Sequence, residues 1–179
     1  MYESVLFPTD GSPGSETAME HVADLASLCD ATVHVLYVAD RENEPSHLVM
    51  RDDDTGFSGM VKPDEIERQS GMTETGDDVM GRAEAAGEQL VDGVAEWLAE
   101  RGLDAVTSVR RGTPYRAIVD YAADNGIDLV VMPTHGRRGV DRFLLGSVTE
   151  KVVRTADAPV LTVRLDDEEA ASDETATEG

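Results

Sequence analysis

The stretch Asp128–Ser147, DLVVMPTHGRRGVDRFLLGS, leads from an apolar run through a glycine-containing loop to the start of a helix. The run Asp128–Met132 is short and rich in valine, which is typical of a buried strand. Ser147 stands three residues before Glu150, the spacing of a capping box, so we expect Ser147 to be the N-cap of the following helix. A strand that leads directly into a helix is the repeating unit of an α/β fold.

The same pattern recurs on both sides of this stretch. Apolar residues at helical spacing, such as Ala18, Val22 and Ala26, separate further apolar runs that resemble strands. These runs cover residues 4–7, 32–38, 105–109 and 159–163. The order βαβ, an interruption, then αβαβαβ predicts one Rossmann-like domain, a doubly wound parallel sheet of five strands with helices on both faces.

Two segments fall outside this alternation. Residues from about 41 to 77 are rich in acids and glycine and show no sustained periodicity, so we interpret them as an acidic insertion. The last residues, 166–179, contain acids but no bases and no apolar pattern, which predicts a disordered acidic tail. The folded domain is therefore predicted to span residues 1–165.

The composition limits the classes of partner. The chain has 37 acidic and 15 basic side chains, a formal net charge of −22, and only two of the bases are lysines. Such a surface repels phosphate backbones and anionic lipids, which argues against nucleic-acid and membrane partners. Acid excess with scarce lysine suggests a salt-adapted organism, because salt screens the self-repulsion. The start of the chain has no basic region followed by an apolar core, so we expect a cytoplasmic protein.

The glycine-containing loop is the strongest candidate for a binding site. Gly136 and Gly139 allow a close approach of the backbone to an anion, and the helix that follows offers unpaired amides at Gly146, Ser147 and Val148. The same loop carries Arg137, Arg138 and Arg142. These features favour phosphate binding, although an ordinary strand-to-helix loop, with Ser147 only as an N-cap, has the same pattern.

Two separated segments resemble motifs of the universal stress protein family. They are the opening Phe7–Ser12, FPTDGS, and the loop with its THGR and LLGSV sequences. Members that bind ATP carry a glycine, two residues, a second glycine, nine residues, and then glycine with serine or threonine. This chain matches with Gly136, nine residues, Gly146 and Ser147, but Pro133 replaces the first glycine and removes its amide. The resemblance excludes the insertion and the tail.

The resemblance implies a fold like that of the adenine nucleotide α-hydrolases, ATP as the ligand, and a homodimer that pairs through strand 159–163. Any Mg²⁺ is then expected on the nucleotide phosphates, since no protein motif for a metal is visible. The nucleotide contacts implied by the resemblance and by the loop are Pro8, Thr9, Asp10, Val38, Met132, Pro133, Thr134, His135, Gly136, Arg137, Arg138, Gly139, Gly146, Ser147 and Val148.

Two of these contacts have competing interpretations. Asp10 lies just after the first strand, where its carboxylate could accept hydrogen bonds from ribose hydroxyls, but an aspartate before glycine also commonly caps local amides. Val38 at the end of the second strand could form an apolar wall for adenine, or it could belong to the core. His135 could titrate near a phosphate, but a loop histidine of this kind is more often incidental.

The absence of other motifs favours binding over catalysis. The sequence contains no Gly-x-x-x-x-Gly-Lys-[Ser/Thr] loop and no nucleophile paired with a recognisable base. We therefore predict an ATP-binding regulatory protein of the stress response, a homodimeric switch with at most slow hydrolysis. A dimeric scaffold that binds no nucleotide and a slow ATP hydrolase are the alternatives.

Overall fold

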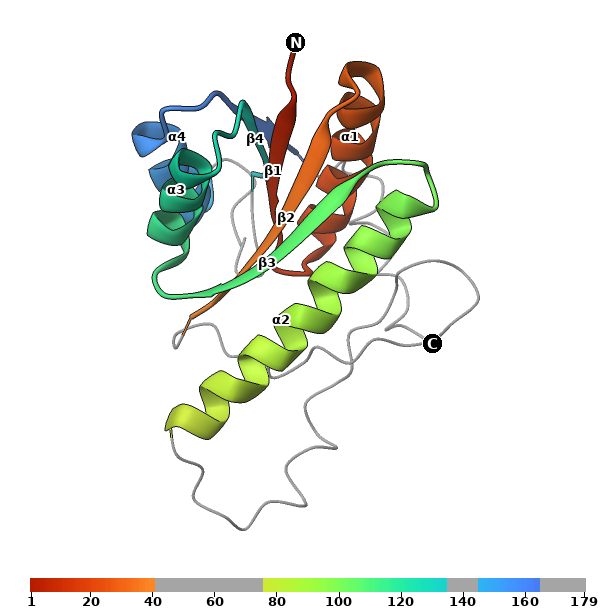
Figure 1. Ribbon diagram of the computed structural model, residues 1–179. Coiled ribbons are helices and arrows are strands. Elements are labelled where there is room, and N and C mark those ends of the chain that lie inside the picture. Colours follow the sequence, from red (N-terminus) through yellow and green to blue (C-terminus); the bar gives the residue numbers. More distant parts are fainter. Residues whose placement is uncertain (41–75, 135–144, 165–179) are drawn as a thin grey trace, which may run out of the picture.

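The computed structural model describes residues 1–40, 76–134 and 145–164 (Figure 1). Helices and strands alternate along the whole of this part of the chain. The elements are β1 (Ser4–Pro8), α1 (Pro13–Cys29), β2 (Thr32–Ala39), α2 (Gly76–Ala99), β3 (Ala105–Arg111), α3 (Pro114–Asp124), β4 (Leu129–Pro133), α4 (Ser147–Thr155) and β5 (Val160–Val163). Most of the predicted insertion, residues 41–75, and the predicted tail lie outside the described residues.

The five strands form one parallel sheet in the order β3-β2-β1-β4-β5. The chain builds outward from β1 to β3, and then returns to the other side of β1 with β4 and β5. The strand order therefore reverses between β1 and β4, which is the switch point where ligands bind in folds of this kind. The predicted fold class is confirmed.

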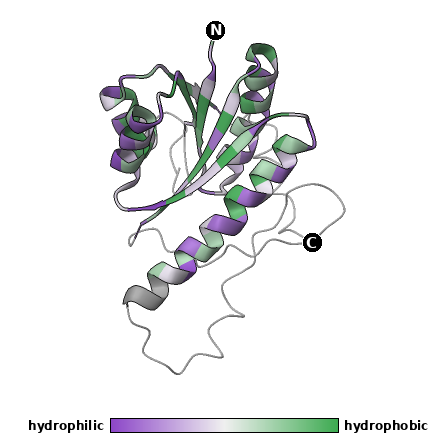
Figure 2. Cartoon of the chain, in the orientation of Figure 1, coloured by the Kyte–Doolittle hydropathy of each residue, from purple (hydrophilic) through white to green (hydrophobic). Residues whose placement is uncertain are grey.

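The two faces of the sheet are covered by different pairs of helices. Alternate strand residues point to opposite faces, so Val5 and Phe7 join the core under α1 and α2, while Leu6 joins the core under α3 and α4. Figure 1 shows the two pairs on opposite sides of the sheet. Figure 2 shows hydrophobic residues gathered in the central strands, with polar residues on the outer sides of the helices.

Helix α2 lies very close to β2. A Cβ atom at Gly87 would come within 2.2 Å of Cδ1 of the buried Tyr37 ring, so only glycine fits at this contact. A Cβ at Gly81, earlier in the same helix, would meet nothing within 4 Å. The helix begins at Gly76, so the predicted end of the insertion at residue 77 was two residues late.

The amino edge of the sheet is held by one carboxylate. Oδ2 of Asp128 accepts hydrogen bonds from the amides of Glu3 at 2.8 Å and Ser4 at 3.0 Å, which ties the start of β1 to the start of β4. These bonds favour the ionised form and lower the pKa of Asp128. Among the described helices, none is both long enough and apolar enough to cross a membrane.

Candidate functional site

The carboxyl ends of β1 and β4 meet at a junction that we call the seam, formed by residues 7–10 and 131–134. Strand β1 pairs with β2 along all five of its residues, but with β4 only at Val5 and Leu6. Both strands end in proline, Pro8 and Pro133, each buried. Neither residue has an amide N–H to donate.

Both missing amides face the seam. The Thr9 amide donates to Leu36 O on β2 at 2.9 Å, and the Thr134 amide donates to Val163 O on β5 at 2.7 Å. Successive residues of a strand direct their backbone groups to opposite sides. One residue earlier, the backbone nitrogen of Pro8 therefore points toward β4, and that of Pro133 points toward β1. The sequence alone identified the missing amide at Pro133, but its direction depends on the register.

A hydrogen-bonded turn follows β1. Oδ1 of Asp10 accepts from the Ser12 amide at 3.0 Å and from the Ser15 hydroxyl at 2.8 Å. Gly11 has φ of 70°, which favours glycine, and Ser12 caps α1 by accepting from the Ser15 amide. The local interpretation of Asp10, as a turn aspartate that binds nearby groups, is correct for these two bonds.

The two ends of the glycine-containing loop are held together. The Gly146 amide donates to Thr134 O at 2.7 Å, and the buried Thr149 hydroxyl donates to Pro133 O at 3.0 Å. These two bonds place the first turn of α4 beside the end of β4. The predicted residues in between, His135, Gly136, Arg137, Arg138 and Gly139, lie outside the described part of the chain.

The predicted capping box is wrong. Gly146, with φ of −55° and ψ of 145°, is the N-cap of α4, and Ser147 is the first helical residue. The carboxylate of Glu150 pairs with Arg154 at 2.8 Å, one turn later in the helix. Because the Gly146 amide is engaged by Thr134, the amides that α4 itself leaves without intrahelical partners begin at Ser147 and Val148.

The remaining predicted contacts divide between the rim of the sheet and the core. Val38 is half-buried near the carboxyl end of β2, and Val148 is half-buried in the first turn of α4; both pack on the core under α3 and α4. Within the seam, Thr9 is buried and Thr134, just after β4, is half-buried. The Met132 side chain is only 4% exposed and belongs to that core, so it supports the site from beneath.

Sequence reasoning missed Ser15 and Thr149, two buried hydroxyls whose bonds fix the loops on either side of the seam. A usable signal existed for Ser15, because it is the third residue after the N-cap Ser12, a position whose side chain reaches back toward the cap. Thr149 gave no comparable signal, since its partner lies on another element. Among the described residues, no three His, Cys, Asp or Glu side chains gather closely enough to hold a metal.

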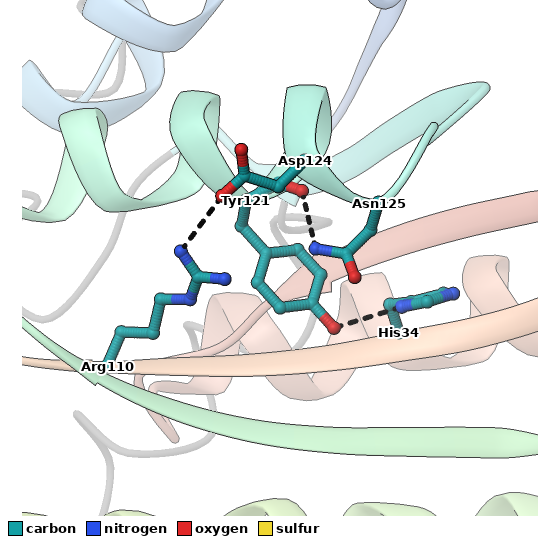
Figure 3. Close-up of polar contacts among 5 residues, drawn as sticks. All are labelled: His34, Arg110, Tyr121, Asp124 and Asn125. Carbon is teal, nitrogen blue, oxygen red and sulfur yellow. Dashed lines mark hydrogen bonds and ion pairs between the residues drawn. The ribbon is translucent and has the colours of Figure 1, made fainter.

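A second polar cluster lies away from the seam, between β2, β3 and α3 (Figure 3). Nδ1 of His34 and the Tyr121 hydroxyl share a 3.0 Å hydrogen bond, the guanidinium of Arg110 lies 4.8 Å from the centroid of the Tyr121 ring, and Arg110 pairs with Asp124 at 3.6 Å. Burial lowers the pKa of His34 and raises that of Tyr121. Because His34 stands in the middle of β2, we assign this cluster to packing.

Comparison with known proteins supplies the family. A model of the universal stress protein family matches residues 1–164. Universal stress protein MJ0531 of Methanocaldococcus jannaschii is 31% identical over 164 residues, which cover 92% of this chain and 83% of that protein.

Two solved structures have the same fold. Protein MJ0577, a universal stress protein of the same organism, superposes with a TM-score of 0.71 at 26% identity, covering 93% of this chain and 99% of that one. A universal stress protein family protein from Arabidopsis thaliana, solved with AMP bound, gives 0.61 at 17% identity and covers 97% and 98% of the two chains.

Proposed function

The chain belongs to the universal stress protein family, and from this premise we propose that it binds an adenine nucleotide, ATP in the first instance, at the seam between β1 and β4. The observation that carries the proposal is the convergence of a ribose-type acceptor and a helix N-terminus on one switch point. Asp10 follows β1, and α4 is tied to the end of β4 through Thr134 and Gly146. The AMP-bound relative from Arabidopsis thaliana, which shares the fold, supports the class of ligand.

Each part of the nucleotide has a matching group in this arrangement. The Asp10 carboxylate accepts hydrogen bonds from the ribose hydroxyls, and Val38 provides an apolar wall for the adenine. The phosphates lie at the first turn of α4, where the Ser147 and Val148 amides and the positive end of the helix dipole favour an anion. Gly136, Arg137 and Arg138 contribute from the loop, and Mg²⁺ is held by the phosphates.

The proposed activity is a homodimeric switch in the stress response. Strand β5 forms one edge of the sheet, and Leu161 on it and Val153 on α4 are 40% and 45% exposed, so pairing of two β5 strands would cover apolar surface and an open edge. The backbone of Thr134 connects these elements, because its amide donates to Val163 O of β5 and its carbonyl accepts from the Gly146 amide at the start of α4. Nucleotide binding can therefore bias the dimer if the two conformations differ in affinity for it.

One specific observation favours a second candidate, a dimeric scaffold that binds no nucleotide. The seam lacks the amide that a glycine at position 133 would supply, and the Gly146 amide already has a backbone partner. A lost hydrogen bond typically costs about 1 kcal/mol, which weakens a nucleotide site without abolishing it. Slow hydrolysis remains a third possibility that the same experiment addresses.

The deciding experiment is isothermal titration of the full chain with ATP and magnesium at low and high salt. We expect saturable binding that Asp10→Ala weakens at least about tenfold and that Gly146→Asp abolishes by placing a carboxylate beside the phosphates. Asp24→Ala, an exposed change of the same type on α1, is the matched control and should bind as the wild type does. Absence of binding at millimolar ATP by a dimeric chain would establish the scaffold, and steady ADP release lost in Gly146→Asp would indicate a hydrolase.

A further inference from the structure

We propose that Ser15 is a positioning residue that orients the Asp10 carboxylate for the ribose, an inference that rests on the proposed nucleotide site. Ser15 is 2% exposed and lies one turn into α1, beneath the loop that carries Asp10. Its hydroxyl donates to Oδ1 of Asp10 at 2.8 Å. Water cannot readily replace a donor at so buried a position, so loss of this hydroxyl would leave Oδ1 without one of its donors.

The Ser15 hydroxyl takes part in the helix cap only through the Ser12 hydroxyl, which lies 3.3 Å from it. Capping of α1 is performed by Ser12, whose side chain accepts from the Ser15 amide at 3.4 Å. The Ser15 hydroxyl instead extends back from the helix to the loop, where the Asp10 amide also lies 3.5 Å from it. Ser15 thus contacts both the backbone and the side chain of Asp10, the residue that we propose binds the ribose.

Two donors converge on the same carboxylate oxygen. The Ser12 amide at 3.0 Å and the Ser15 hydroxyl at 2.8 Å both bond Oδ1, and they approach it from the loop backbone and from the helix. Donors from two directions fix the rotation of the carboxylate about its side-chain bonds. A ligand group held in this way loses less conformational entropy on binding, which raises affinity without any new contact.

This arrangement reconciles the two interpretations of Asp10. The bonds on Oδ1 make it a turn aspartate, and the same bonds orient the carboxylate that we propose accepts from the ribose hydroxyls. Removal of Ser15 should therefore reduce recognition of the ribose specifically. Contacts of the phosphates and adenine, which lie on α4 and β2, should be unaffected.

The test compares ATP with 2′,3′-dideoxy-ATP, which lacks both ribose hydroxyls, by titration calorimetry on the full chain. We expect the wild type to prefer ATP by about tenfold. Ser15→Ala should lose most of this preference by weakening ATP alone, and adding Ser15→Ala to Asp10→Ala should cause no further loss. Thr17→Ala is the matched control, because its hydroxyl bonds Pro13 O on the same helix and does not contact Asp10.

The outcomes separate the two proposals. A Ser15→Ala variant that melts cooperatively and keeps the wild-type preference overturns the positioning role and leaves nucleotide binding intact. A wild type that binds neither nucleotide overturns both. If Ser15→Ala does not fold, Ser15→Cys keeps the size and a weak donor, and an intermediate preference is then expected; a preference equal to that of the wild type would overturn the inference.

Discussion

The two faces of the sheet are built by different means. Under α1 and α2 the contact is almost entirely apolar, and it is close enough that Gly87 touches the Tyr37 ring. Under α3 and α4 the core is smaller, and the cluster of His34, Tyr121 and Arg110 continues it with hydrogen-bonded polar groups. Packing on the first face therefore depends mainly on steric fit, whereas packing on the second face also depends on hydrogen bonds between polar side chains.

The two helical layers also differ in net charge. Helix α1 carries three acids and α2 six, against a single arginine, so this layer has a net charge of −8. Helices α3 and α4 carry three acids, two arginines and one lysine, a net charge of zero. Much of the acidity of the described chain is therefore concentrated on the face of α1 and α2, where Glu84 pairs with Arg111 of β3.

The first prediction addresses the steric fit and has the largest expected effect. Gly87→Ala places a Cβ against the Tyr37 ring and should destabilise the protein by about 1–3 kcal/mol, the usual cost of overpacking a core. Gly81→Ala is the matched control, because it lies in the same helix with open space around it and should stabilise by up to about 1 kcal/mol through helix propensity. Urea denaturation of both variants measures the difference, and equal shifts would contradict the close contact.

The second prediction addresses the polar face. Tyr121→Phe deletes the hydroxyl that bonds His34 and should lower the free energy of unfolding by about 1 kcal/mol at neutral pH. Tyr115→Phe removes a tyrosine hydroxyl from the same helix whose partner is the exposed Arg116, and it should cost much less. A Tyr121→Phe variant as stable as the wild type would show that the polar cluster contributes nothing to this face.

The fold could be predicted from sequence to a much greater extent than these contacts. Strand and helix order depends on local periodicity, and all five strands were predicted correctly from it. The capping box at Ser147 failed because the N-cap of α4 is Gly146, whose amide bonds Thr134 just after β4, a contact distant in sequence. His34 and Tyr121 stand 87 positions apart, so no local pattern could indicate their bond.

The site was predicted in outline and not in its hydrogen bonds. The position of Asp10 after β1 and of the glycine-containing loop after β4 follows from the element order. The direction of the missing Pro133 amide depends on the register, and the partner of Asp10 depends on the packing of α1. These depend on tertiary structure, which a single sequence does not reveal.

The third prediction uses pH to examine the polar face further. Burial lowers the pKa of His34 in the folded state, so the unfolded chain, with an ordinary value of about 6.5, binds more protons. The stability contributed by neutral His34 is therefore fully present above about pH 6.5, and it is lost as the pH falls from there through the lowered pKa of the folded state. Arg110 and Asp124, the other charged members of the cluster, pair with each other at 3.6 Å.

His34→Gln should flatten the dependence of stability on pH between about 7 and 5.5. His21→Gln, an exposed change on α1, should leave that dependence as it is in the wild type. Urea denaturation at a series of pH values measures both, with carboxylates contributing equally to all three proteins. An unchanged slope in His34→Gln would mean that His34 stays solvated in the folded protein.

The last and smallest prediction concerns the acidic layer. Glu88, Asp92 and Glu96 follow one another at intervals of four along α2, so like charges are neighbours on its surface, whereas Glu84 pairs with Arg111 of β3. Each such pair destabilises a helix by about 0.2–0.5 kcal/mol, and an opposite-charge pair stabilises it by a similar amount. Asp92→Lys should therefore raise the melting temperature at low salt.

Salt should reduce that gain, because the Debye length falls from about 10 Å at 0.1 M to about 3 Å at 1 M. Arg154→Glu provides the opposite case on the balanced face, since it converts the 2.8 Å pair with Glu150 into a like-charge pair and should lower the melting temperature at low salt. Opposite shifts for the two variants that both diminish in salt would show that the acidic face carries a repulsion that the other face avoids. Shifts of the same sign would show that the separation of charge between the two layers has no effect on stability.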